Sequence, residues 1–179
     1  MSAIPKHRYE EYYKEHEKKR YLDFMLSLSD DISIESDTWI CEKRLKSQSQ
    51  LLSKVSIYFS KVPEQYREMV KYYAILRLIE GNCVITVARN VGNIANFLNF
   101  IGHNGLEKIA VMTASCFKAY LDEKGYAECT RSGIWSDVSI FLRKMNGFDG
   151  MELFKPFYSN PYEAKQLVDP KYIPEYVVK

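Results

Sequence analysis

Hydrophobic residues recur every three to four positions in four separate segments between residues 64 and 145. This spacing puts them on one face of an α-helix and predicts helices over about 64–79, 86–101, 113–124 and 128–145. Gly81, Gly102 and Gly125 follow the first three segments, and we expect them to end those helices. The four helices are expected to form two helical hairpins around one core.

Two short β-prone runs precede the helices, at residues 38–41 and 55–59, and they predict a short β-hairpin around a polar middle. Before them, residues 5–28 are dense in Lys, Glu and Tyr. That composition predicts a charged, solvated helix that forms an arm and not part of the core. Its partial apolar stripe is Tyr9, Tyr13, Leu22 and Met25.

The chain is therefore expected to be mainly α, in four parts. These are a charged arm (1–37), the β-hairpin segment (38–62), a helical domain (63–147) and a proline-rich linker (148–179). The final residues, from Pro174 to Val178, read as the first turn of another helix. Because one turn does not form alone, we expect the chain to lead into a further domain.

Composition limits the classes of function. With 46% hydrophobic residues in 179, the chain can bury a core, and a net charge of +2 argues only weakly for nucleic acid. No apolar run is long enough for a membrane span or a signal peptide, so we expect a cytoplasmic protein with reduced thiols. The four cysteines and three histidines have no metal-ligand spacing, so we expect no metal. We also expect no cofactor and no small-molecule substrate.

Two of the predicted helices share one pattern: Thr86-x7-Ile94-x2-Phe97-Leu98 recurs 44 residues later as Thr130-x7-Val138-x2-Phe141-Leu142. In each, the face away from the apolar stripe is small and polar and carries an arginine, which suits a helix that lies in a DNA groove. Arginine reaches phosphates or guanine, asparagine pairs with adenine, and hydroxyls hold phosphate oxygens. The competing interpretations are an ordinary polar surface and, for the two threonines, helix capping. The polar-face residues are Arg89, Asn93, Asn96, Ser132, Ser136, Ser139 and Arg143.

The order of these elements resembles the N-terminal half of tyrosine recombinases, the phage integrase family. The resemblance is carried by QYREMVKYYAILRLIEGN, by the Thr-led helix ending in IANFLNFIG, by CTRSGIWSDVSIFLRKM and by the proline-rich passage to DPKYIPEYVV. It implies a four-helix, SAM-like core-binding domain that grips double-stranded DNA at a recombination site. Its second and fourth helices would lie toward the major groove. The DNA-contacting residues it points to, with one added base, are Thr86, Arg89, Asn93, Asn96, Thr130, Arg131, Ser132, Ser136, Arg143 and Lys71.

The same resemblance limits what the chain does by itself. The family's catalytic arginines, lysine, histidines and nucleophilic tyrosine belong to a catalytic domain beyond the linker, and none can be matched here. We therefore expect binding without cleavage, in a parent that integrates or excises a mobile element as a homotetramer on DNA. The alternative is a helical protein-interaction module that binds no DNA, and salt dependence would separate the two.

Overall fold

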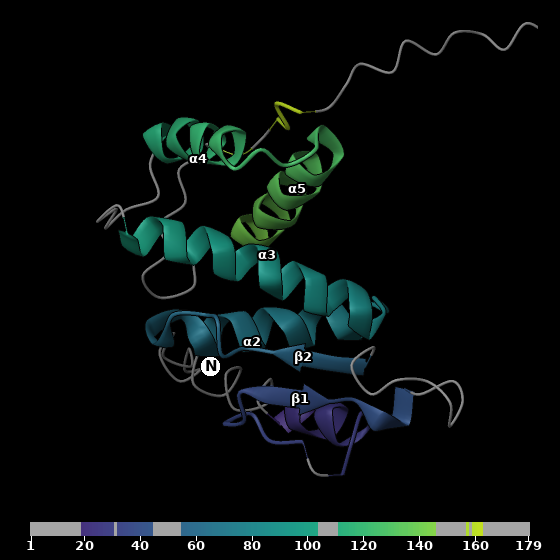
Figure 1. Cartoon of the computed structure of the whole chain (residues 1–179). Helices are drawn as coiled ribbons and strands as arrows, with labels where there is room; N and C mark the ends of the chain where they lie inside the picture. The colour runs from purple at the N-terminus through teal and green to yellow at the C-terminus, as the bar shows by residue number, and fades with distance from the viewer. Residues whose placement is uncertain are drawn as a thin grey trace, which may run out of the picture.

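The computed structural model describes residues 19–30, 32–44, 55–103, 111–145, 157 and 159–162. The protein is mainly helical with a small two-stranded antiparallel sheet (Figure 1), as the sequence predicts. Residues 19–26 are helical. The remaining elements, in chain order, are β1 (Thr38–Ile40), η1 (Glu42–Arg44), β2 (Ser56–Tyr58), α2 (Glu64–Ile79), α3 (Val84–His103), α4 (Val111–Glu123) and α5 (Glu128–Lys144).

The ends of the helices follow local chemistry. Gly81 and Gly125 have φ angles of 87° and 66°, which suit glycine, and each follows a helix end as predicted. The Asn82 side-chain amide donates to the Arg77 carbonyl at 2.9 Å and so closes α2. The predicted stop at Gly102 is wrong, because α3 continues through it to His103.

The predicted β-hairpin is present and packs into the core. Trp39 pairs with Ile57 across the two strands, and both side chains are fully buried. The ring of Trp39 lies 4.6 Å from that of Phe59, edge to face. Alternation along the strands turns Ile40 and Tyr58 to the exposed side.

Helix α3 is the central element of the fold. In Figure 1 it lies between α2 and the hairpin on one side and α4 and α5 on the other. Phe97 of α3 contacts Phe117 of α4, and their ring centroids are 4.9 Å apart. α5 packs mainly on α3 and also meets α2, where the ring centroids of Phe141 and Tyr73 are 5.3 Å apart. α4 and α5 diverge from the turn that joins them (Figure 1). The second predicted hairpin is therefore open, because both of its helices pack on α3.

The prediction of a solvated N-terminal arm is wrong for residues 19–30. Tyr21, Met25 and Leu28 recur at helical spacing and belong to the core, with exposed fractions of 7%, 1% and 0%. Leu22, which was assigned to the apolar stripe, is exposed instead. Tyr9 and Tyr13 lie outside the described residues.

The described part of the predicted proline-rich linker, Phe157 and residues 159–162, packs against the helices. Phe157 and Tyr162 are buried against the helices. The ring of Phe157 lies 4.7 Å from that of Trp135 on α5, and the Trp135 indole nitrogen donates to the Ser159 carbonyl at 3.0 Å. We call Phe157 and residues 159–162 the clasp, because they fasten to α4 and α5.

Candidate nucleic-acid interface

The outer face of α3 is free of acidic residues, as is the whole helix. Arg89 projects from this face with 65% of its side chain exposed. Gly92 follows one turn later and is exposed, and the half-buried Asn96 accepts a hydrogen bond from the Tyr120 hydroxyl at 2.9 Å. Arg89, Gly92 and Asn96 therefore form one narrow stripe along α3. The stripe carries a single positive charge, at Arg89, and no side chain projects from it at Gly92.

A buried carboxylate joins α3 to α5. Asp137 of α5 accepts a hydrogen bond from the Asn93 side-chain amide at 2.7 Å, and its Oδ2 lies 3.5 Å from the Arg89 Nε. The Asp137 side chain is only 7% exposed, so Asn93 and Arg89 supply the polar partners that a buried charge requires. Asn93 therefore lies at the contact between α3 and α5. This contact places the middle of the outer face of α3 next to the middle of the outer face of α5.

The outer face of α5 is also flat where it is exposed. Thr130, Gly133 and Arg143 are exposed along it, and Ser136 and Ile140 are half-buried. A Cβ built on Gly133 or on Gly92 would meet no atom within 4 Å. Glycine inside a helix costs about 0.5–1 kcal/mol relative to alanine, and neither position offsets that cost through packing among the described residues.

The two threonines do not cap their helices. Because α3 begins at Val84 and α5 at Glu128, each threonine is the third helical residue. The Thr86 hydroxyl lies 3.0 Å from the Cys83 sulfur, and Thr130 is exposed. The capping interpretation is therefore wrong for both, and the Thr130 hydroxyl is accessible to a ligand.

Two of the predicted serines lie beneath the clasp. The Asn160 side-chain amide donates to the Ser132 hydroxyl at 2.9 Å, to the Ser132 carbonyl at 3.1 Å and to the Ser136 hydroxyl at 3.0 Å. Its side-chain oxygen accepts from the Tyr162 backbone amide at 3.0 Å. The serine hydroxyls are thus engaged by the chain itself.

Arg131 is engaged at the same place. Its guanidinium lies 4.9 Å from the centre of the Tyr162 ring and bonds to Asp122 of α4 at 2.5 Å. Hydrogen bonds from Lys118 first, and then from Tyr162 and Arg131, hold the pKa of Asp122 below its ordinary value. Burial, with a smaller contribution from Asp122, raises the pKa of Tyr162 to about 12. Arg131 therefore belongs to a network that joins α4, α5 and the clasp.

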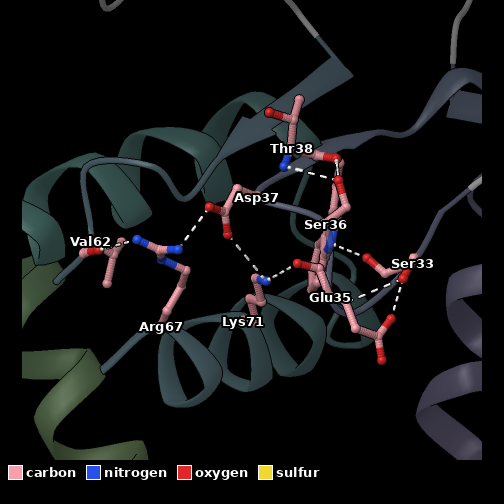
Figure 2. Close-up of polar contacts among 9 residues, drawn as sticks. Ser33, Glu35, Ser36, Asp37, Thr38, Val62, Arg67 and Lys71 are labelled. Carbon is pink, nitrogen blue, oxygen red and sulfur yellow. Dashed lines mark hydrogen bonds and ion pairs between the residues drawn. The ribbon is translucent and has the colours of Figure 1, made fainter. Parts of the chain in front are cut away.

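The predicted contact Lys71 lies inside the protein. Its side chain is 7% exposed and its ammonium donates to the Glu35 carbonyl at 3.0 Å, with Asp37 at 3.5 Å (Figure 2). The ammonium also lies 5.7 Å from the centre of the Phe59 ring. Arg67 reaches the same Asp37 carboxylate at 2.8 Å. Arg67 and Lys71 thus hold the loop before β1, and Lys71 is not part of the exposed face.

The last two residues of the predicted face differ in their exposure. Ser139 is buried and donates to the Trp135 carbonyl at 2.8 Å, within its own helix. Arg143 is exposed near the C-terminus of α5 and contacts only the Ser139 carbonyl, at 3.4 Å, among the described residues. Arg143 and Arg89 are therefore the predicted bases that reach solvent.

Sequence reasoning missed Asp137, Asn160, Gly92 and Gly133. The two glycines were visible in the sequence as breaks in otherwise good helices, at positions on the polar face. Asp137 lies four residues after Gly133, next to the apolar stripe. An acidic residue at such a position is expected to be buried and to need polar partners. Nothing in the sequence relates Asn160 to serines 24 and 28 residues earlier.

Comparisons of the chain with protein-family models, with curated proteins and with solved structures give no match. None of them bears on the resemblance to tyrosine recombinases, which remains a hypothesis carried by the sequence pattern. In the part of the chain that the structure describes, no helix combines the length and apolar character that a membrane crossing demands. Within the same residues, no three His, Cys, Asp or Glu side chains are grouped so as to hold a metal ion.

Proposed function

We propose that this chain is a DNA-binding module of the tyrosine-recombinase core-binding type, which grips duplex DNA with the outer faces of α3 and α5. The observation that carries the proposal is the pair of flat, glycine-centred helix faces, each with an exposed arginine. One contains Arg89 and Gly92, and the other contains Gly133 and Arg143. Glycines without internal packing leave room for a ligand backbone to come close to the helix.

The chemistry of the exposed residues suits a phosphate backbone. Arg89 and Arg143 would each contact a phosphate, and the Thr130 hydroxyl near the N-terminus of α5 would hold a phosphate oxygen. Asn96 would approach a base edge once its hydrogen bond to Tyr120 is exchanged. Lys71 and Asn93 would act indirectly, because the first anchors the loop before β1 and the second holds α3 against α5.

The parent protein would be a site-specific recombinase of a mobile element, with four copies assembled on DNA. Its catalytic residues would lie outside this chain, and we assign no catalytic residue here. The chain would supply grip and orientation on the recombination site, and strand cleavage would need the rest of the parent.

The test is binding to a fluorescein-labelled DNA duplex, followed by fluorescence anisotropy. Arg89→Gln and Arg143→Gln should each weaken binding several-fold, because each removes one phosphate contact. Arg44→Gln is the matched control: Arg44 is exposed in η1, which follows β1, and β1 lies on the other side of α3 from α5 (Figure 1). Equal affinities for all three variants and the wild type would refute the proposed surface.

A second candidate function is a protein-interaction module. It is favoured by Ile85, which is 57% exposed and lies one turn before Arg89 on the same stripe of α3. A partner helix with an apolar ridge and an acidic flank would match Ile85 and Arg89 together. Binding that needs Ile85 and is insensitive to salt would favour this candidate over DNA.

A further inference from the structure

We infer that the clasp is an autoinhibitory contact that covers the N-terminal half of the α5 face and must be released before DNA engages it fully. The inference rests on the proposed function and adds a regulation of that same surface. It comes from one juxtaposition: the clasp engages Arg131, Ser132 and Ser136, three of the polar side chains expected to face DNA.

Asn160 is the centre of the clasp. Its single amide nitrogen lies within hydrogen-bond distance of three oxygens on adjacent turns of α5: the Ser132 hydroxyl, the Ser132 carbonyl and the Ser136 hydroxyl. Asn160 uses lone pairs of the two serine hydroxyls, so it competes with an external ligand by occupying the space over these serines. The clasp therefore occupies α5 in the manner of a ligand.

Two further contacts fix the clasp on either side of Asn160. The Trp135 indole donates to the Ser159 carbonyl, and the Tyr162 hydroxyl donates to the Lys118 carbonyl at 3.1 Å and to Asp122 at 3.0 Å. Asp122 is also the partner of Arg131. The acid that anchors the clasp thus also neutralises the arginine, so the closed state removes both hydroxyls and positive charge from the face.

Release exposes the two rings that anchor the clasp, because Phe157 and Tyr162 are buried against the helices. Ser159 and Pro161 are exposed and Asn160 is half-buried, so the middle of the clasp rests on the surface. Opening would free Arg131 from the Tyr162 ring and expose Ser132 and Ser136 beside the accessible Thr130 and Gly133. The result is one polar face along the first two turns of α5.

If DNA binds only the open state, the apparent affinity of the protein for DNA is the affinity of the open state multiplied by the fraction of molecules that are open. Asn160→Ala removes the central contacts and should tighten DNA binding roughly tenfold, the change expected from one or two lost hydrogen bonds in the competing closed state. Tyr162→Phe should tighten it several-fold by removing the hydroxyl contacts. Ser159→Ala is the matched control, because Ser159 contributes its backbone carbonyl, and its affinity should equal that of the wild type.

The experiment measures DNA affinity by anisotropy for the full chain and these three variants, with thermal unfolding to confirm that each is folded. Hydrogen exchange of the clasp amides, with and without DNA, is the second readout and should show faster exchange when DNA is bound. Tighter binding by Asn160→Ala and Tyr162→Phe, with DNA-induced exchange in the clasp, supports the inference.

Two other outcomes overturn it and are distinguishable. If the wild type binds DNA and Asn160→Ala binds equally or more weakly, the clasp is not inhibitory, whereas the proposed function stands. If neither the wild type nor the folded Asn160→Ala variant binds DNA, the proposed function fails and the inference fails with it.

Discussion

Replacing Gly92 by alanine should make the protein more stable and a poorer DNA binder at once. Gly92 lies near the middle of α3, it is exposed, and its backbone is helical. An added Cβ would meet no atom within 4 Å, so it introduces no clash. Only the backbone preference changes, and it favours alanine in a helix interior.

The magnitude follows from that preference. Alanine is better than glycine by about 0.5–1 kcal/mol in a helix interior, partly because glycine loses more conformational freedom on folding. For a chain of this size, a gain of about 1 kcal/mol corresponds to an increase of roughly 2–4 °C in Tm. Gly133→Ala on α5 meets the same open space and should give a gain of the same order.

The effect on binding has the opposite sign. If a phosphate backbone approaches the helix at Gly92, a methyl group there separates the two surfaces and lengthens the contact of Arg89, one turn away. We expect affinity for a DNA duplex to fall several-fold. The assay pairs urea unfolding with anisotropy on the same protein preparations, so that stability and affinity are compared directly.

Gly102→Ala is the control for this pair of measurements. Gly102 lies on the same helix, is exposed and also faces open space, but it lies near the C-terminus of α3, about 20 Å along the helix from Arg89. It should leave DNA affinity unchanged. An unaltered or improved affinity in Gly92→Ala would refute a close approach at α3, and a loss of stability would show that Gly92 has a packing role in the fold.

Three further predictions concern the fold that supports this surface. Lys71→Met should lower the free energy of unfolding by about 1–2 kcal/mol, because it removes the charged donor to the Glu35 carbonyl. Lys61→Met, at an exposed lysine, is the control and should lower it by under about 0.5 kcal/mol, with both values measured by urea unfolding. An unchanged stability with weaker DNA binding in Lys71→Met would restore Lys71 as a direct contact. Burial raises the pKa of Tyr73 to about 12, so its neutral hydroxyl favours the folded state below pH 10, and about 2–3 kcal/mol of stability should be lost as pH rises from about 10 to 12. Tyr73→Phe should make that loss smaller in unfolding curves across this pH range, and an identical pH profile would contradict the assignment. Met25→Ala should destabilise the protein by about 2–4 kcal/mol, and the exposed Leu22→Ala by under about 0.5 kcal/mol; equal thermal unfolding of the two would show that residues 19–30 do not contribute to the core.

The helices and the hairpin could be predicted from the sequence because their signals are local. Apolar spacing predicted α2 with its observed bounds and the other helices within about two residues, and the β-prone runs around Trp39 and Ile57 predicted the strands. The N-terminal segment was misjudged because its charge outweighed the i, i+4, i+7 spacing of Tyr21, Met25 and Leu28. That spacing was present in the sequence and indicates a helix with one buried side.

The candidate surface was only partly predictable. A helical projection identifies Arg89, Thr130 and Arg143 as outward residues, and the structure exposes all three. Projection alone does not show what covers the other polar positions. Lys71 is buried beneath a loop 36 residues earlier in the chain, and Ser136 is partly covered by Asn160, 24 residues later. Such long-range contacts depend on tertiary packing and leave no local pattern.

The most direct test of the account is the salt dependence of DNA binding by the wild type and by the double variant Arg89→Gln/Arg143→Gln. A plot of log affinity against log salt between about 50 and 200 mM gives a slope close to 0.9 for each phosphate contact. The account predicts binding by the wild type that falls steeply with salt, and a slope shallower by about two contacts in the double variant. Equal slopes for the two proteins, or no binding to DNA by the folded wild type, would contradict it.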